Sequence, residues 1–223
     1  MEYWYDSSNV EYNRFTNLDG IEDKILFYLI SEKDKNSKQL DMVHTIWRIL
    51  YYNDEYCLVD DEQHPLPKYK DIVKLIDNYG NEQMKSRLFR YPFVEDTITE
   101  RCSQIRVYVD SVIPESHLIS NVGIAIEVII HNKIANIINN LYNEEDEPNN
   151  PTETQPLVTY KNRSSVLLRN VLALLNGADI AGVGKLQFNR QQNGYSQALL
   201  GKWNNRNFFG YKVIMGCSMS GTI

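Results

Sequence analysis

Two runs near the middle of the chain alternate between apolar positions and polar or mixed positions. They cover residues 104–110 and 121–131. Both place β-branched residues at every second position: Ile105, Val107 and Val109 in the first, and Val122, Ile124, Ile126, Val128 and Ile130 in the second. Because successive side chains of a strand point to opposite faces, each run predicts a strand with one apolar face. Pro114 lies between the runs, so we expect two antiparallel strands rather than one continuous strand.

The first part of the chain has helical patterns instead. Apolar residues recur at intervals of three and four over residues 19–31, where Asp19 is the expected cap, and over residues 40–50. Residues 46–52 also fit a strand, and the pattern leaves that alternative open. Residues 71–77 predict a short helix. The segment before it, 53–70, is rich in acids and contains two prolines, which is typical of a loop.

The second half of the chain predicts one long helix and further strands. The helix covers residues 166–175, capped by Ser164 or Ser165, and ends at an Asn-Gly pair. Strands are expected at residues 183–189 and 208–219. Residues 133–142 either continue the second central strand or form a short helix. The predicted fold class is therefore α+β, an antiparallel sheet with helices packed on it.

The chain divides into an N-terminal arm, a helical part and an α+β core, at residues 1–17, 18–85 and 86–223, and we expect one structural domain overall. The arm has no helical or strand period, yet it is rich in aromatic side chains: Tyr3, Trp4, Tyr5, Tyr12 and Phe15. Solvated tails rarely carry so many aromatic residues. The arm therefore either docks on a neighbouring subunit or packs on its own domain.

One segment of the core, residues 143–156, has a low-complexity composition with three prolines. It carries five acids: Glu144, Glu145, Asp146, Glu147 and Glu153. Such a segment cannot pack in a core, because burying even one unpaired charge costs several kcal/mol. We predict a projecting loop that faces a channel or a neighbouring subunit, with an idle solvent loop as the alternative.

The composition limits the classes of function. The formal net charge of -6 argues against DNA affinity as the main role, since phosphate binding requires a positive field. No apolar run approaches the roughly 18–20 residues of a membrane span, and no secretory signal is expected. The three cysteines are too widely spaced for a disulfide framework or a metal site.

Two motifs invite a chemical interpretation, and both are incomplete. Residues 177–185 resemble a phosphate-binding loop, but Asp179 and Leu186 replace residues that the motif requires, and the segment runs from a helix into a strand. Asp110 and Glu127 could hold a metal ion on one face of the sheet, as in strand-borne nucleases. The lysine expected two residues after the acid is Ile129 here. The structural interpretation of Glu127 is a charge that disfavours wrong strand pairing.

The four histidines do not add a site. They are scattered along the chain: His44, His64, His117 and His131. No pair has the spacing of metal ligands, and none has an evident nucleophile beside it. We therefore expect no cofactor, no metal and no catalytic residues.

From Arg87 onward the sequence resembles neck proteins of tailed bacteriophages, in particular the ring-forming head-to-tail connector proteins of crAss-like phages. The resemblance is carried by residues 87–93, 103–110, 126–131, 163–177 and 208–219. It implies a fold like that of tail terminators and connectors, preceded here by an N-terminal helical extension.

The resemblance also implies a function. Such proteins are structural virion proteins, not enzymes, and form rings that join the portal to the tail. The expected partners are copies of the chain itself in a dodecamer or hexamer, the portal or other neck and tail ring proteins, and DNA that passes through without specific binding. No membrane is expected, and the protein would be made in the bacterial cytoplasm. The alternatives are a small metal-dependent nuclease using Asp110 and Glu127, and a cytoplasmic binding module.

Overall fold

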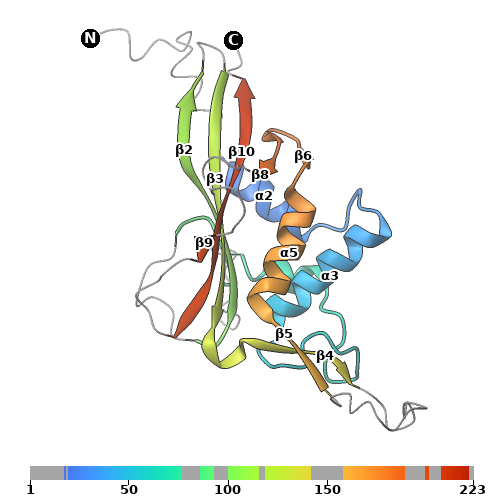
Figure 1. Ribbon diagram of the computed structural model, residues 1–223. Helices are drawn as coiled ribbons and strands as arrows, with labels where there is room; N and C mark the ends of the chain where they lie inside the picture. Colours follow the sequence, from blue (N-terminus) through green and yellow to red (C-terminus); the bar gives the residue numbers. More distant parts are fainter. Residues whose placement is uncertain are drawn as a thin grey trace, which may run out of the picture.

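In the computed structural model, one long twisted sheet stands beside a layer of helices (Figure 1). The structure describes residues 18, 20–76, 86–92, 100–115, 119–141, 158–188, 199–200 and 207–220. The helices cover one face of the sheet, so the α+β fold class predicted from the sequence is confirmed. Among the described residues, no helix combines the length and the hydrophobicity that crossing a membrane requires.

Three long antiparallel strands form the centre of the sheet. They are β2 (Ser103–Pro114), β3 (Ile119–His131) and β10 (Phe208–Ser220). β3 pairs with β2 on one side and with β10 along its whole length on the other. The two central strands and the last strand are therefore confirmed. Pro114 separates two antiparallel strands, as predicted, and it is the last residue of β2, where a missing N–H is tolerated.

Short strands complete the sheet at its edges. β1 (Leu88–Phe89) pairs in parallel with β2, so the sheet is mixed rather than purely antiparallel. β8 (Gln187–Phe188) and β9 (Leu199–Leu200) pair antiparallel with β10. The strand order is β1-β2-β3-β10-β8, with β9 beside β10. The strand expected at 183–189 is thus divided between β7 (Gly184–Lys185) and β8.

The backbones of β3 and β10 approach each other closely at Gly210. A Cβ built on this residue would lie 1.8 Å from the carbonyl oxygen of Val128, which no other side chain tolerates. Glycine inside a strand marks such close approaches of two backbones. Position 210 of β10 therefore has to be a glycine.

The first two helices begin after different kinds of N-cap residue. α2 (Ile21–Ile30) has Gly20 as its N-cap, with φ of 71°, so the expected cap Asp19 is wrong. α3 (Ser37–Tyr51) begins with a capping box in which Asn36 and Gln39 bond reciprocally. The strand alternative for residues 46–52 is wrong, since α3 covers nearly all of that segment. α4 (Tyr69–Val73) is a short helix slightly earlier than expected.

α5 (Arg163–Leu175) is the long helix that lies along the sheet. Its N-cap is Asn162, whose side chain accepts a hydrogen bond from the amide of Ser165 at 3.2 Å. Neither Ser164 nor Ser165 caps the helix, because both lie in its first turn. The helix ends at the predicted Asn-Gly pair, and Gly177 has a φ of 86°, which favours glycine.

Two small sheets lie outside the main one. After the 3-10 helix η1 (Asn132–Ile134), β4 (Asn136–Leu141) pairs with β5 (Val158–Asn162). This hairpin leads away from the body of the molecule (Figure 1). The acidic segment predicted to project connects these two strands, and it lies outside the described residues. The second small sheet joins β6 (Asp179–Ile180) to β7.

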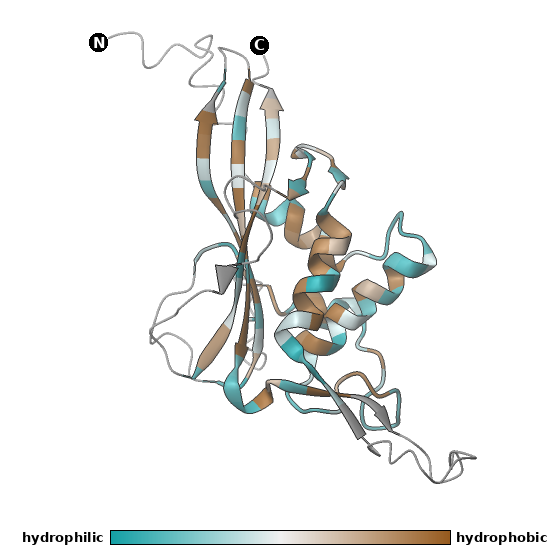
Figure 2. Cartoon of the chain, viewed as in Figure 1, coloured by the Kyte–Doolittle hydropathy of each residue, from teal (hydrophilic) through white to brown (hydrophobic). Residues whose placement is uncertain are grey.

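The helices and the sheet share one hydrophobic core. Apolar side chains from α2, α3 and α5 pack against the face of the sheet that carries the predicted alternating residues. Figure 2 shows this apolar surface between the two layers. Each fully buried Leu, Ile or Val stabilises the fold by about 1.5–3 kcal/mol relative to an exposed position. The helical N-terminal part therefore packs in the same core as the residues that follow it.

Candidate functional site

The sheet face opposite the helices carries a row of charged residues across the three long strands. Arg106 on β2 and Lys212 on β10 are both register partners of Glu127 on β3, which therefore lies between two cations. Arg106 has no exposed surface and Glu127 is almost fully buried. Buried charges need partners, and the register places one cation on each side of Glu127.

Arg106 is held by neighbours on its own side of the sheet. Its Nη2 donates to Gln104 Oε1 at 3.0 Å, and its Nη1 donates to the carbonyl oxygen of Pro92 at 3.0 Å. The guanidinium lies over the ring of Phe89, 4.1 Å from the centroid. Arg106 thus fixes the short strand β1 and the segment after it against β2 by a cation–π contact and hydrogen bonds.

The two carboxylates considered for a metal site share this face, and each already has a partner. Tyr108 donates its hydroxyl to Glu127 Oε1 at 2.8 Å, and Lys212 donates its ammonium to Asp110 Oδ1 at 2.7 Å. Burial, together with the bond to Glu127, raises the pKa of Tyr108 to about 12. Desolvation lowers the pKa of Lys212, but its bonds to Asp110 and Tyr108 outweigh this and raise it.

Lys212 is the residue that the sequence reasoning missed. A lysine was sought two positions after Glu127, whereas the structure supplies one from β10, directly across the sheet. Only the register of β10 against β3 could have revealed it. Within the described part of the chain, no group of three or more His, Cys, Asp or Glu side chains has a geometry that could hold a metal ion.

The glycine-rich segment 177–185 connects α5 to the small strands β6 and β7, as the sequence order implied. Gly182 and Gly184 have positive φ values of 74° and 91°. The carbonyl oxygen of Gly182 accepts a hydrogen bond from the ammonium of Lys24 on α2 at 3.3 Å. The segment therefore acts as a turn that also contacts α2, and it does not lead into a helix whose amides could bind phosphate.

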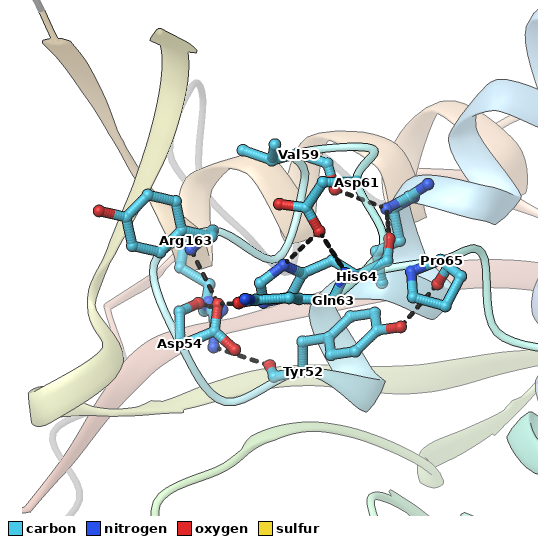
Figure 3. Close-up of polar contacts among 10 residues, drawn as sticks. Tyr52, Asp54, Val59, Asp61, Gln63, His64, Pro65 and Arg163 are labelled. Carbon is cyan, nitrogen blue, oxygen red and sulfur yellow. Dashed lines mark hydrogen bonds and ion pairs between the residues drawn. The ribbon is translucent and has the colours of Figure 1, made fainter.

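A second polar cluster lies in the loop after α3 and centres on His64 (Figure 3). Its Nε2 lies 3.2 Å from Asp54 Oδ1, and its Nδ1 lies 3.0 Å from Asp61 Oδ1. The ring contacts Tyr52 edge-on, with centroids 5.0 Å apart. Tyr56 stacks near it at 6.4 Å. His64 is almost fully buried, although it lies in a loop.

Hydrogen bonds to the backbone hold this loop in place. Asp61 Oδ1 accepts from the amides of Gln63 and His64 at 2.9 and 2.7 Å. Desolvation acts to raise the pKa of Asp61, but these bonds and the His64 ring lower it overall. Arg48 on α3 donates to the carbonyl oxygens of Val59 and His64 at 2.9 and 2.6 Å.

The contacts of the His64 cluster hold the loop after α3 together. The two carboxylates lie on opposite sides of the ring, so they cannot converge on one ion. Among the described residues no hydroxyl or thiol bonds to the ring, and the Tyr52 hydroxyl donates instead to the carbonyl oxygen of Pro65 at 2.6 Å. The sequence pattern had identified only an acidic loop here.

A third feature is the end of the main sheet, where the long strands extend beyond the helix layer (Figure 1). Ile113 on β2 pairs with Asn121, and Ile119 lies two residues before Asn121 on the same face of β3. The side chains of Ile113 and Ile119 are 54% and 42% exposed. Diagonal neighbours on one sheet face lie about 7–8 Å apart, so the two exposed isoleucines are neighbours in one apolar patch. We call this patch the sheet tip.

Two groups of residues singled out in the sequence lie outside the described residues. The first is the N-terminal arm: Tyr3, Trp4, Tyr5, Tyr12 and Phe15. The second is the acidic segment between β4 and β5: Glu144, Glu145, Asp146, Glu147 and Glu153. Their predicted roles in contacts between subunits or along a channel remain predictions.

Comparison with models of protein families matches residues 44–217 to the family described as YomW. The matched region covers well over half of the chain, from α3 to the far end of β10. The match indicates a phage-related protein. No curated protein and no solved structure matches the chain.

Proposed function

The chain belongs to the YomW family, and from this phage-related origin we propose that it is a structural protein of a phage virion. Copies of the chain form a ring, a dodecamer or a hexamer, in the neck or tail. The ring joins the portal to the tail and lets DNA pass without specific binding. The sequence resemblance to head-to-tail connector proteins supports this assignment.

The observation that carries the proposal is the sheet tip. Contiguous exposed apolar patches rimmed by polar residues mark surfaces that another protein covers, and in the proposed ring a neighbouring subunit covers the sheet tip. The β4–β5 hairpin projects elsewhere on the molecule (Figure 1). A ring requires two different, complementary surfaces on each subunit, because its contacts are heterologous. Two projections on one subunit fit that requirement.

The charge of the chain supports a channel rather than a DNA-binding role. A formal net charge of -6 produces a field that repels the DNA backbone. In a ring this repulsion keeps DNA from being arrested as it passes.

We also propose that the protein has no enzymatic activity. Asp110 and Glu127 each bond to a neighbouring side chain, and Lys212 places an ammonium beside Asp110, where a nuclease would need a metal ion. Incubation with DNA and Mg²⁺ or Mn²⁺ should show no cleavage above background. Cleavage that Glu127→Gln abolishes would contradict this part of the proposal.

The assembly is tested by native mass spectrometry and negative-stain imaging of the purified protein, alone and with the portal. We expect rings in at least one of these two conditions. Ile119→Asp should weaken assembly, because a charge replaces apolar contact at the sheet tip. Leu66→Asp is the matched control, since Leu66 is 39% exposed but lies in the loop before α4.

Two outcomes would overturn the proposal, and a third would overturn only the role of the sheet tip. The first is a monomer in both conditions, and the second is absence of the protein from purified virions probed with a specific antibody. The third concerns the sheet tip alone. Rings that form equally well with Ile119→Asp and with Leu66→Asp would show that the sheet tip is not an interface.

A further inference from the structure

The surface has a small hollow between the last turns of α5 and the edge strand β8. It is lined by Leu172, Ala173, Asn176 and Phe188 and has a volume of about 290 Å³. Leu172 and Phe188 are half-buried and pack partly against the core, whereas Ala173 is exposed. The Oδ1 of Asn176 accepts the amide of Phe188 at 3.0 Å, which holds β8 against the end of the helix. This bond joins the two elements that form the walls of the hollow.

The size and the lining of the hollow indicate what it can bind. Small-molecule sites generally measure about 300–1,000 Å³ and enclose their ligand. This hollow is at the lower limit, and an open site of this size suits a single large side chain. Its walls are apolar, and an amide side chain lies among them. Tyr and Trp match such a site, because each has a large apolar ring and one polar group.

We propose that the hollow binds an aromatic side chain from the N-terminal arm, residues 1–17, of a second copy of the chain. The inference rests on the proposed function, because it requires a neighbouring subunit. The arm is rich in aromatic residues, and Tyr3, Trp4 and Tyr5 are consecutive. A ring closes through heterologous contacts, and an arm that binds the next subunit would be one of them.

The position where the arm joins the domain shows which part of the fold the arm starts from. Leu18 packs partly against the core, immediately before α2. Lys24 on α2 bonds to Gly182 in the segment that follows α5, so the beginning of α2 lies near the end of α5 that bears the hollow. An extended chain of 17 residues spans at most roughly 56–61 Å. In the proposed ring, an arm of this length extends from one subunit to the hollow of the next.

The first experiment fills the hollow. Ala173→Trp places a large ring in it without disturbing the core, because Ala173 is exposed. We expect self-association to weaken about tenfold or more, as is typical when an anchoring aromatic contact is lost. Ala181→Trp is the matched control, since Ala181 is also exposed but does not line the hollow. Sedimentation at several protein concentrations measures the change.

The second experiment identifies the occupant directly. A photo-reactive benzophenone amino acid replaces Tyr3, Trp4 or Tyr5 in turn. Equal amounts of ordinary and heavy-isotope-labelled copies are mixed, assembled and irradiated. Mass spectrometry then identifies the crosslinked peptides. We expect crosslinks to the peptide containing Leu172 and Asn176, and we expect them between copies of different isotopic mass.

Each alternative outcome has a defined meaning. Crosslinks to this peptide only within one copy would overturn the role of the second copy, and crosslinks elsewhere would overturn the hollow as the site. Rings that form normally with Ala173→Trp and show no crosslink at the hollow would refute this inference and leave the proposed function intact. If no oligomer forms in any condition, both fail.

Discussion

Replacing Arg163 with Met tests how the loop after α3 is fastened to the rest of the fold. Arg163 is the first residue of α5 and has no exposed surface. Its Nη1 donates to the carbonyl oxygen of Tyr52 at 3.3 Å and to Ser103 Oγ at 3.4 Å. Its Nη2 donates to the carbonyl oxygen of Asp54 at 2.5 Å. One side chain therefore joins the loop, the strand β2 and the helix.

The expected loss of stability follows from these bonds. A hydrogen bond from a charged donor contributes about 1.5–3 kcal/mol, and the two carbonyl oxygens would lose their donor. Part of this loss is offset, because the desolvation cost of a buried guanidinium also disappears. Methionine keeps much of the packing volume, so we expect a net loss of about 3 kcal/mol. For a chain of this length that corresponds to a fall in Tm of roughly 6–12 °C.

Urea and thermal unfolding measure the loss, and hydrogen exchange locates it. Arg169→Met is the control, because Arg169 lies on the same helix but is exposed. Exchange should increase in residues 53–68 of the Arg163 variant and remain unchanged in the control. A difference of less than about 0.5 kcal/mol between the two variants, the usual range for surface substitutions, would show that Arg163 does not fasten the loop.

Three further predictions concern the core and its titratable groups. Val171→Asp places a charge at a fully buried position of α5 and should abolish soluble expression, whereas Arg169→Asp on the exposed side should not. Burial raises the pKa of the Cys217 thiol to about 11, so it should resist alkylation at pH 8 until the protein is denatured. The pKa of Tyr108 is raised to about 12 in the folded protein, so its neutral hydroxyl stabilises the fold fully below pH 10, and this contribution is lost as the pH rises towards about 12. In unfolding titrations over that interval, Tyr108→Phe should therefore lose less stability than the unsubstituted protein.

The long strands could be predicted because their information is local. The alternating residues of β3 occupy consecutive positions and need no other part of the chain to be recognised. Helix ends were harder, because several capping residues are adjacent in the sequence. Asn162, Ser164 and Ser165 all favour an N-cap, and only the structure shows that the Asn162 side chain accepts the bond. Because Asn162 is the N-cap, Arg163 is the first residue of the helix, and its side chain is buried.

The elements that the sequence did not reveal depend on contacts between distant residues. The loop after α3 lacks a hydrophobic period, yet His64 becomes buried because Asp54, Asp61 and Arg48 bond around it. The hairpin strand β4 is held to this loop by the amide of Ile138, which donates to the carbonyl oxygen of Glu55 at 2.8 Å. No local pattern encodes such pairs. The same is true of Lys212, which meets Glu127 only through the register of β10.

The charged row links this register to the proposed interface. A shift of β10 by one residue would turn Lys212 towards the apolar core, because side chains alternate between the faces. A shift by two residues would place Lys212 opposite Ala125 or Ile129, so its ammonium would no longer lie opposite the buried Glu127. The pairing of β3 with β10 is thereby fixed along its whole length, including the end that projects beyond the helices. A patch can dock reproducibly on a neighbour only if the strands beneath it have one register, so the buried charges define the geometry of the sheet tip.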